Sequence, residues 1–289
     1  MLGAAVVVYL VVIGTLIGAA VRAPRSREAM AARSTTRWVA AVAGSTMCVV
    51  AAVLAYTLRV VDLLRDPVTT SMTIAITGHQ WWWEAVYDDA DPNNRFTTAN
   101  EIHVPVGQPV AIALRSADVI HSFWVPSLAG KRDLTPGHPS RLLIQADTPG
   151  VYRGQCSQFC GLQHAHMALV VVADAPERFA EWASEQRRAA NAPSAADSLR
   201  ARGKTVFVAA RCGTCHTIEG VISLAAFGPN LTHLAARATI AAGTLTNTPE
   251  HLAAWVRDPQ SAKRGATMPP NPLNAADLEA LVAYLGALK

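Results

Sequence analysis

The chain has 289 residues, of which 51% are hydrophobic and 16% charged, and its mean hydropathy is +0.21. This length allows two or three modest domains, and the hydropathy is high for a chain without membrane segments. The formal net charge of +4 is supplied by residues 22–37, which hold five arginines and one glutamate. The charges of the other residues cancel, so the sequence shows no basic patch that would predict a nucleic-acid partner.

Two apolar segments near the start of the chain, residues 2–21 and 38–58, contain no charged side chain. Each reaches the ~20 residues that a membrane-spanning helix needs. The arginine-rich residues 22–37 between them predict a cytoplasmic loop, because short basic loops stay on that side. We therefore expect a transmembrane hairpin over residues 1–61. A cleaved signal peptide over residues 1–23 is the alternative, and the missing basic start disfavours it.

Short β-rich runs separated by turn signals dominate residues 62–175. Several such runs at this spacing predict an all-β sandwich or barrel. The expected strands lie in residues 71–78, 82–88, 101–107, 109–116, 140–146, 150–155 and 167–174.

The remaining residues read as helical, apart from a linker. Residues 176–195 combine a helix that starts near Pro176 with the linker "NAPSAADS". Residues 196–289 form a third unit, and its last helix follows Asn274, a residue type that favours the helix N-cap. Residues 62–175 carry seven basic and eleven acidic side chains, and residues 176–289 carry twelve and nine. The opposite net charges of residues 62–175 and 176–289 weakly favour docking of these two parts of the chain, and such docking would weaken as salt rises.

The stretch Cys212-Gly213-Thr214-Cys215-His216 follows C-x-x-C-H, the covalent attachment pattern of c-type haem. Its two thiols would bond the haem, and His216 would ligate the iron. Met268 is the one methionine after Met167, so it is the candidate for the second axial ligand. A thioredoxin-like pair or half a zinc site are alternatives, although no second C-x-x-C follows.

Residues 196–289 also resemble small class I cytochromes c, in "GKTVF", "GPNL", "MPP" and the last helix. The resemblance implies an all-α domain with one covalently bound haem c. It also implies that Gly203 and Phe207 pack against the last helix, and that the Pro229 carbonyl holds the ring of His216.

A second cluster of soft donors lies in "GQCSQFCGLQHAHM", residues 154–167. Cys156, Cys160, His164 and Met167 together form a donor set that suits copper better than calcium or magnesium. A disulfide or a zinc site would leave the methionine without a role. A dinuclear copper site needs one more histidine, and His121 on an earlier β segment is the candidate.

The hairpin and the stretches "GHQWWWEAVY", "VIHSFWVPSLAGKRDLTPG" and "GVYRGQCSQFCGLQHAHM" resemble subunit II of the haem–copper cytochrome c oxidases over nearly all of residues 1–175. The resemblance implies a cupredoxin-type Greek-key barrel with a dinuclear copper A centre. Its two bridging thiolates would be Cys156 and Cys160, with one histidine on each copper. The implied further ligands are His121, His164, Met167 as a weak ligand, and Gln158 through its backbone carbonyl.

Other positions follow from the same resemblance. Trp81 is the candidate for the point where electrons enter the copper site. His103, His138 and His166 are expected not to bind metal. Many relatives have glutamate where Gln158 stands, and that carboxylate also binds magnesium at the boundary with subunit I, so Gln158 weakens the case for magnesium.

The implied function is that of subunit II in an aerobic terminal oxidase. Electrons would pass from haem c through copper A to subunit I, which reduces oxygen to water with proton translocation. The implied partners are oxidase subunits I and III, with cytochrome c or a cytochrome bc1-type complex as donor. The implied location is the bacterial inner membrane, multi-pass, with the copper and haem domains on the periplasmic side. Two alternatives are a membrane-anchored copper A/haem c shuttle for another reductase, and a copper chaperone or thiol redox protein.

Overall fold

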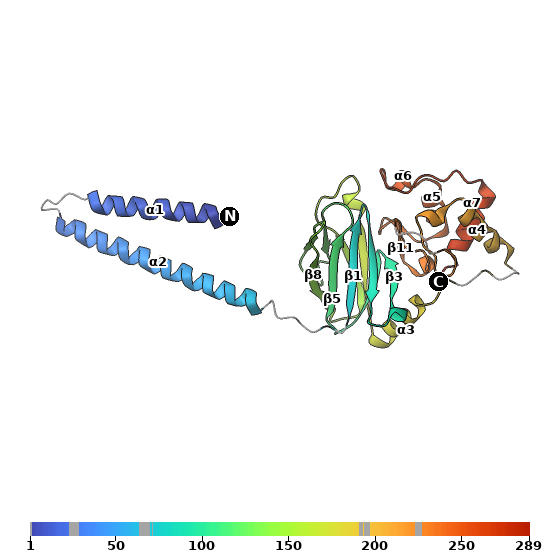
Figure 1. Cartoon of the computed structure of the whole chain (residues 1–289), viewed down its shortest axis with the longest axis horizontal. Coiled ribbons are helices and arrows are strands. Elements are labelled where there is room, and N and C mark those ends of the chain that lie inside the picture. Colours follow the sequence, from blue (N-terminus) through green and yellow to red (C-terminus); the bar gives the residue numbers. More distant parts are fainter. Residues whose placement is uncertain are drawn as a thin grey trace. The chain divides into compact units, whose positions relative to one another are not determined.

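The computed structural model describes residues 2–22, 29–63, 70, 72–190, 193, 197–222 and 227–289. It divides into two compact units, Met1–Val68 and Thr69–Lys289. Figure 1 shows both units and labels some of their elements.

The first unit consists of two helices, α1 (Leu2–Arg22) and α2 (Ala29–Leu63). They touch where the Tyr9 hydroxyl donates to the Met47 sulfur at 2.7 Å. One helix among the described residues, Thr35–Asp62, is long and apolar enough to cross a membrane by length and composition. The described apolar part of α1, Tyr9–Arg22, is shorter.

The loop predicted over residues 22–37 is shorter than expected. Helix α2 already begins at Ala29, because the alanine-rich run that follows favours a helix despite its arginines. The expected loop residues 23–28 lie outside the described part of the chain.

The second unit begins with two facing five-stranded sheets, drawn mainly in green in Figure 1. One has the order β3-β2-β1-β5-β8 and the other β4-β10-β9-β6-β7. Parallel pairing of β1 with β5 and of β4 with β10 joins strands distant in sequence, whereas the other pairs are antiparallel. The domain is a cupredoxin-like β-sandwich, as predicted. The strands are β1 Thr73–His79, β2 Trp82–Asp88, β3 Phe96–Ala99, β4 Glu101–Pro105, β5 Val110–Ser116, β6 His121–Trp124, β7 Arg132–Leu134, β8 Ser140–Ile144, β9 Gly150–Cys156 and β10 Ala168–Asp174.

The seven predicted strands are present, and β6 is the earlier β segment expected to carry His121, while β3 and β7 were missed. Both are only three or four residues long, and neither has enough length to show an alternating pattern. Buried and partly buried residues alternate along β1. This two-residue period is what allowed the longer strands to be predicted from the sequence. The core between the sheets is built around Trp83 and Phe123, whose rings meet edge to face at 5.9 Å.

Helix α3 (Pro176–Gln186) packs onto the β-domain. Trp182 stacks on His103 with ring centroids 4.1 Å apart and also contacts Tyr87 and Phe96. The helix therefore completes the β-domain core. Linker residues 191, 192 and 194–196 lie outside the described part.

The C-terminal part contains the helices α4 Ser198–Ala209, α5 Pro249–Arg257, α6 Pro259–Ala262 and α7 Ala275–Leu285. Asn274 caps α7, its side chain accepting from the Asp277 amide, as predicted. Helices α4 and α7 cross at Gly203, where a Cβ atom would lie 2.0 Å from the Ala280 carbonyl oxygen. Phe207 meets Tyr284 edge to face beside this crossing. The expected packing of Gly203 and Phe207 against the last helix is confirmed.

The expectation of an all-α C-terminal domain needs one correction. A two-stranded ribbon, β11 (Thr239–Ile240) with β12 (Leu245–Thr246), interrupts the helices. Its turn uses left-handed backbone at Ala241, Ala242 and Gly243. Alanine has no sequence signature for that conformation, so the turn was not predictable.

Candidate metal centres

The first candidate centre is formed by the loop between β9 and β10. Strand β9 ends at Cys156, and β10 begins at Ala168, directly after Met167. The Cys156 amide donates to the Met167 carbonyl at 2.9 Å, which closes the base of the loop. Because the strands pair up to that point, the loop between them is held at both ends.

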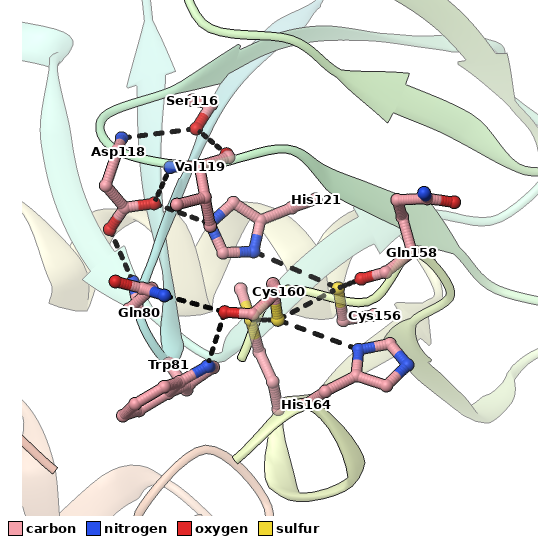
Figure 2. Close-up of polar contacts among 11 residues, drawn as sticks. Gln80, Trp81, Ser116, Asp118, Val119, His121, Cys156, Gln158, Cys160 and His164 are labelled. Carbon is pink, nitrogen blue, oxygen red and sulfur yellow. Dashed lines mark hydrogen bonds and ion pairs between the residues drawn. The ribbon is translucent and has the colours of Figure 1, made fainter. Parts of the chain in front are cut away.

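The structure brings the six sequence-predicted copper donors together around one small space (Figure 2). The sulfurs of Cys156 and Cys160 are 3.8 Å apart. The Cys160 sulfur lies 3.6 Å from His164 Nδ1 and 3.9 Å from the Met167 sulfur. The Cys156 sulfur lies 3.2 Å from the Gln158 carbonyl oxygen.

His121 reaches this space from a different part of the sequence. Strand β6 carries it, and the pairing of β6 with β9 puts Phe123 opposite Cys156. His121 Nδ1 then lies 3.9 Å from the Cys156 sulfur. His121, Cys156 and Cys160 are all buried, with their donor atoms within 4.8 Å of one another.

The two sulfurs, 3.8 Å apart, are close enough for one thiol to donate to the other. The hydrogen bond between their sulfurs lowers the pKa of Cys156 and raises the pKa of Cys160. These directions favour the thiolate form at Cys156 and the protonated form at Cys160. A soft cation that binds both sulfurs would displace the remaining proton, since thiolate is the metal-binding form. The donor set of thiolates, imidazoles and thioether fits copper.

The ring of His121 is fixed by Asp118. Its Nε2 lies 2.7 Å from the Asp118 carboxylate, so its Nδ1 faces the Cys156 sulfur. Burial lowers the pKa of His121, but hydrogen bonds with Cys156 and Asp118 outweigh it and the net direction is upward. Gly78 permits this placement, because a Cβ atom there would lie 2.9 Å from the ring. A carboxylate behind a ligand histidine is a common feature of metal sites.

Gln80 and Trp81 support the loop from the β1–β2 turn (Figure 2). The Gln80 side-chain amide and the Trp81 indole both donate to the Cys160 carbonyl, at 2.7 and 3.0 Å. The Gln80 backbone amide donates to Asp118 at 2.7 Å. Sequence reasoning missed Asp118 and Gln80. Asp118, three residues before His121, was the available local signal.

Two of the other histidines are engaged by neighbouring side chains. His166 turns its Nδ1 to the Gln163 side chain at 2.7 Å. His103 Nδ1 lies 2.6 Å from Asp174, and its Nε2 lies 3.5 Å from Glu101.

The second candidate centre is a cavity of about 480 Å³ in the C-terminal domain. Cys212, Cys215, His216 and Met268 all line it, as the sequence predicts for a haem pocket. The Pro229 carbonyl lies 2.8 Å from His216 Nδ1, so the expected support of this ring is confirmed. Burial lowers the pKa of His216, and this direction favours the neutral imidazole, which is the form that binds iron.

The residues that line the cavity suit a haem in their polarity. Most of the lining is apolar, and the buried Arg237 guanidinium in this lining has an Nε without a hydrogen-bond partner among the described residues. A carboxylate from the bound group would satisfy it. The apolar lining includes Phe207, Leu231, Leu234, Ile240, Leu252, Trp255, Val256, Leu281 and Leu285.

The β-domain forms part of the wall of the same cavity. Trp81 and Trp82 line it from the β1–β2 turn, together with Gln80 and Asn100. Trp81 therefore touches both candidate centres, through its indole N–H at the Cys160 carbonyl and through its position in the cavity wall. The second unit therefore carries two candidate metal centres, and the first unit contains a helix long and apolar enough to cross a membrane.

Comparison with known proteins gives two family matches. Residues 91–174 match the family "Cytochrome C oxidase subunit II, periplasmic domain", and residues 200–289 match "Cytochrome c". The chain is 40% identical over 217 residues to Cytochrome c oxidase subunit 2 of Alkalihalophilus pseudofirmus, covering 75% of this chain and 61% of the relative. The protein of that name in Bacillus subtilis is 30% identical, with coverages of 76% and 63%. Two parts of the chain thus match known families, the periplasmic domain of cytochrome c oxidase subunit II and cytochrome c, and the curated relatives named here are cytochrome c oxidase subunits 2.

Among solved structures, the periplasmic domain of subunit II of cytochrome oxidase from Bradyrhizobium japonicum is similar at 30% identity and a TM-score of 0.39. The match covers 41% of this chain and 95% of that chain. The chain spans slightly less than two thirds of the length of the bacterial relatives named above.

Proposed function

We propose that the chain is subunit II of an aerobic terminal cytochrome c oxidase and passes electrons from its own haem c through a dinuclear copper A centre to subunit I. The observation that carries the proposal is the gathering of six soft or carbonyl donors in the β-domain beside a C-x-x-C-H cavity in the same chain. In the complete complex, oxygen would be reduced to water with proton translocation.

Six donors of the β-domain would hold the copper ions. Cys156 and Cys160 would bridge them, and His121, His164, Met167 and the Gln158 carbonyl would complete the set. Bound copper would supply a one-electron couple shared over two ions. The chain would contribute a buried site with fixed ligands, because the loop closes at Cys156–Met167 and Asp118 orients His121.

The C-terminal cavity would hold one haem covalently through Cys212 and Cys215. Bound haem would supply a second one-electron couple, with His216 and Met268 as axial ligands. The Pro229 carbonyl would orient His216, and Gln260 donates to the Met268 carbonyl at 3.2 Å, which supports the methionine loop. Arg237 would neutralise a haem carboxylate in the cavity.

The remaining assignments follow from the family matches and the N-terminal helices. The protein would be multi-pass in a bacterial inner membrane, with both α1 and α2 crossing it and the second unit on the periplasmic side. Its partners would be oxidase subunits I and III, with cytochrome c or a bc1-type complex as donor. Trp81 would be the point where electrons enter the copper site. Gln158 offers no carboxylate for magnesium.

The test is low-temperature electron paramagnetic resonance of the full chain, loaded with copper and haem. A hyperfine pattern from one electron shared by two coppers, beside a low-spin haem signal, is expected. Replacing Cys156 by serine should abolish the copper pattern and leave the haem spectrum unchanged. A single-copper spectrum in the unmodified protein would refute the dinuclear assignment.

A further inference from the structure

Lys263 occupies an unusual position between the two domains of the second unit. It follows α6 and precedes the Met268 loop, yet it is only 3% exposed. Its ammonium donates to three backbone carbonyls, those of Trp81 at 2.8 Å, His166 at 2.8 Å and Ala241 at 3.2 Å. An ammonium has three N–H donors, so this side chain is fully satisfied without a carboxylate.

The carbonyls come from both domains. Ala241 belongs to the β11–β12 turn, whereas Trp81 and His166 belong to the β-domain. His166 directly precedes Met167, and the Trp81 indole donates to the Cys160 carbonyl. One side chain of the C-terminal domain thus holds two backbone segments that flank the candidate copper ligands.

Uncharged contacts surround Lys263 on the same interface. The Gln163 side chain donates to the Arg264 carbonyl at 2.7 Å. This bond joins the loop between β9 and β10, here called the copper loop, to the segment that leads to Met268. The Ala168 amide donates to the Ala242 carbonyl at 3.0 Å. The two domains pack closely at Gly243, because a Cβ atom there would lie 2.9 Å from the Ala168 side chain.

The interface buries the Lys263 side chain. Burial lowers the pKa of Lys263 to about 7, against a smaller opposing effect of the Cys160 sulfur. Among the described residues no ion pair joins the β-domain to the C-terminal domain. The salt-sensitive docking expected from net charge stays a prediction, and the contacts described here favour its alternative, a transfer rate that does not change with salt.

We propose that Lys263 is a positioning residue that fixes the cytochrome c domain against the copper loop, so that electrons cross a preformed interface within one rigid unit. This inference rests on the proposed electron path from haem to copper. In this proposal Lys263 aligns the two centres, and other residues bind the copper and the haem.

The test compares Lys263→Met with Arg264→Met in the full-length holoprotein in detergent. Both variants replace a basic side chain by methionine in adjacent positions, but the Arg264 side chain is exposed and its carbonyl remains available to Gln163. After a reducing pulse to the haem, the rate of copper reduction is measured at increasing viscosity and salt. Pulsed electron paramagnetic resonance of the oxidised protein gives the distribution of haem–copper distances.

Unmodified protein and Arg264→Met should show a fast rate that is independent of salt and viscosity, with a narrow distance distribution. In Lys263→Met we expect a broad distribution and a rate that falls about tenfold and depends on viscosity, because the aligned arrangement would be only fractionally populated. Copper hyperfine splitting and haem potential should stay unchanged, which separates misalignment from damage to either site.

An unchanged rate and a narrow distance distribution in Lys263→Met would overturn the inference. Absence of haem-to-copper transfer in the unmodified protein would instead overturn the proposed electron path, and the distance distributions would still decide the role of Lys263. If Lys263→Met does not incorporate both groups, Lys263→Gln, which keeps N–H donors without the charge, is measured on the same criteria.

Discussion

The carboxylate of Asp118 and the imidazole of His121 lie 2.7 Å apart, and this contact turns the other ring nitrogen of His121 towards the Cys156 sulfur. The same carboxylate accepts from the Gln80 backbone amide at 2.7 Å. It therefore joins the β1–β2 turn, which also carries Trp81, to a copper ligand.

Replacing Asp118 by asparagine should weaken copper binding by about 10- to 100-fold, the usual effect of losing a partner behind a ligand histidine. The haem spectrum should stay unchanged. Competitive copper titration against a chelator measures the affinity, and Asp133→Asn, at an exposed position of the same domain, is the control. Equal affinities in the two variants would show that Asp118 has no part in holding the ligand.

Replacing Met268 by alanine should keep the haem attached through Cys212 and Cys215 while lowering its reduction potential. The fall should be on the order of 0.1 V, within the ~0.8 V that axial ligands span. Thr267→Ala, in the same loop and exposed, is the control for loop disturbance. Redox titration followed by visible absorption measures both, and an unchanged potential in Met268→Ala would point to another axial ligand.

Gly203→Ala should destabilise the C-terminal domain, because the new Cβ would lie 2.0 Å from the Ala280 carbonyl oxygen and force α4 and α7 apart. The cost should be about 1–3 kcal/mol, typical of overpacking. Gly130→Ala meets nothing within 4 Å and should change the free energy of unfolding by less than about 0.5 kcal/mol. Thermal unfolding followed at the haem band distinguishes the two, and equal melting temperatures would contradict the crossing.

Tyr87 should make the β-domain sensitive to alkaline pH. Burial raises its pKa well above the ordinary 10.0, and its hydroxyl donates to the His103 carbonyl. Above about pH 10 the unfolded chain loses this proton while the folded chain keeps it, so stability present below pH 10 is lost as pH rises, by up to about 1.4 kcal/mol per pH unit.

Tyr87→Phe should remove this contribution to the pH slope. It should also cost about 1–3 kcal/mol at neutral pH, because the amide and carbonyl of His103 lose their partner. Denaturant unfolding of the protein and the variant at pH 8 and pH 11 measures both effects. Parallel losses in the two proteins would assign the alkaline sensitivity to other groups.

The chemistry-bearing motifs were readable because each is local. The spacing from Cys156 to Met167 and the stretch from Cys212 to His216 place their donors within one loop or one turn, whatever the rest of the chain does. Strands with a two-residue period and the cap at Asn274 are local for the same reason. The strands β3 and β7 are too short to show an alternating pattern, so they could not be predicted in this way.

The sequence by itself determined the donor types, their spacing and the apolar helix that can cross a membrane. Only the tertiary structure decided that β6 pairs with β9 and so brings His121 to the cysteines, and that Asp118 stands behind its ring. It also decided that Lys263 joins the two domains. The physical reason is that Lys263 binds backbone carbonyls, which every residue possesses, so nothing in the side-chain sequence marks its partners.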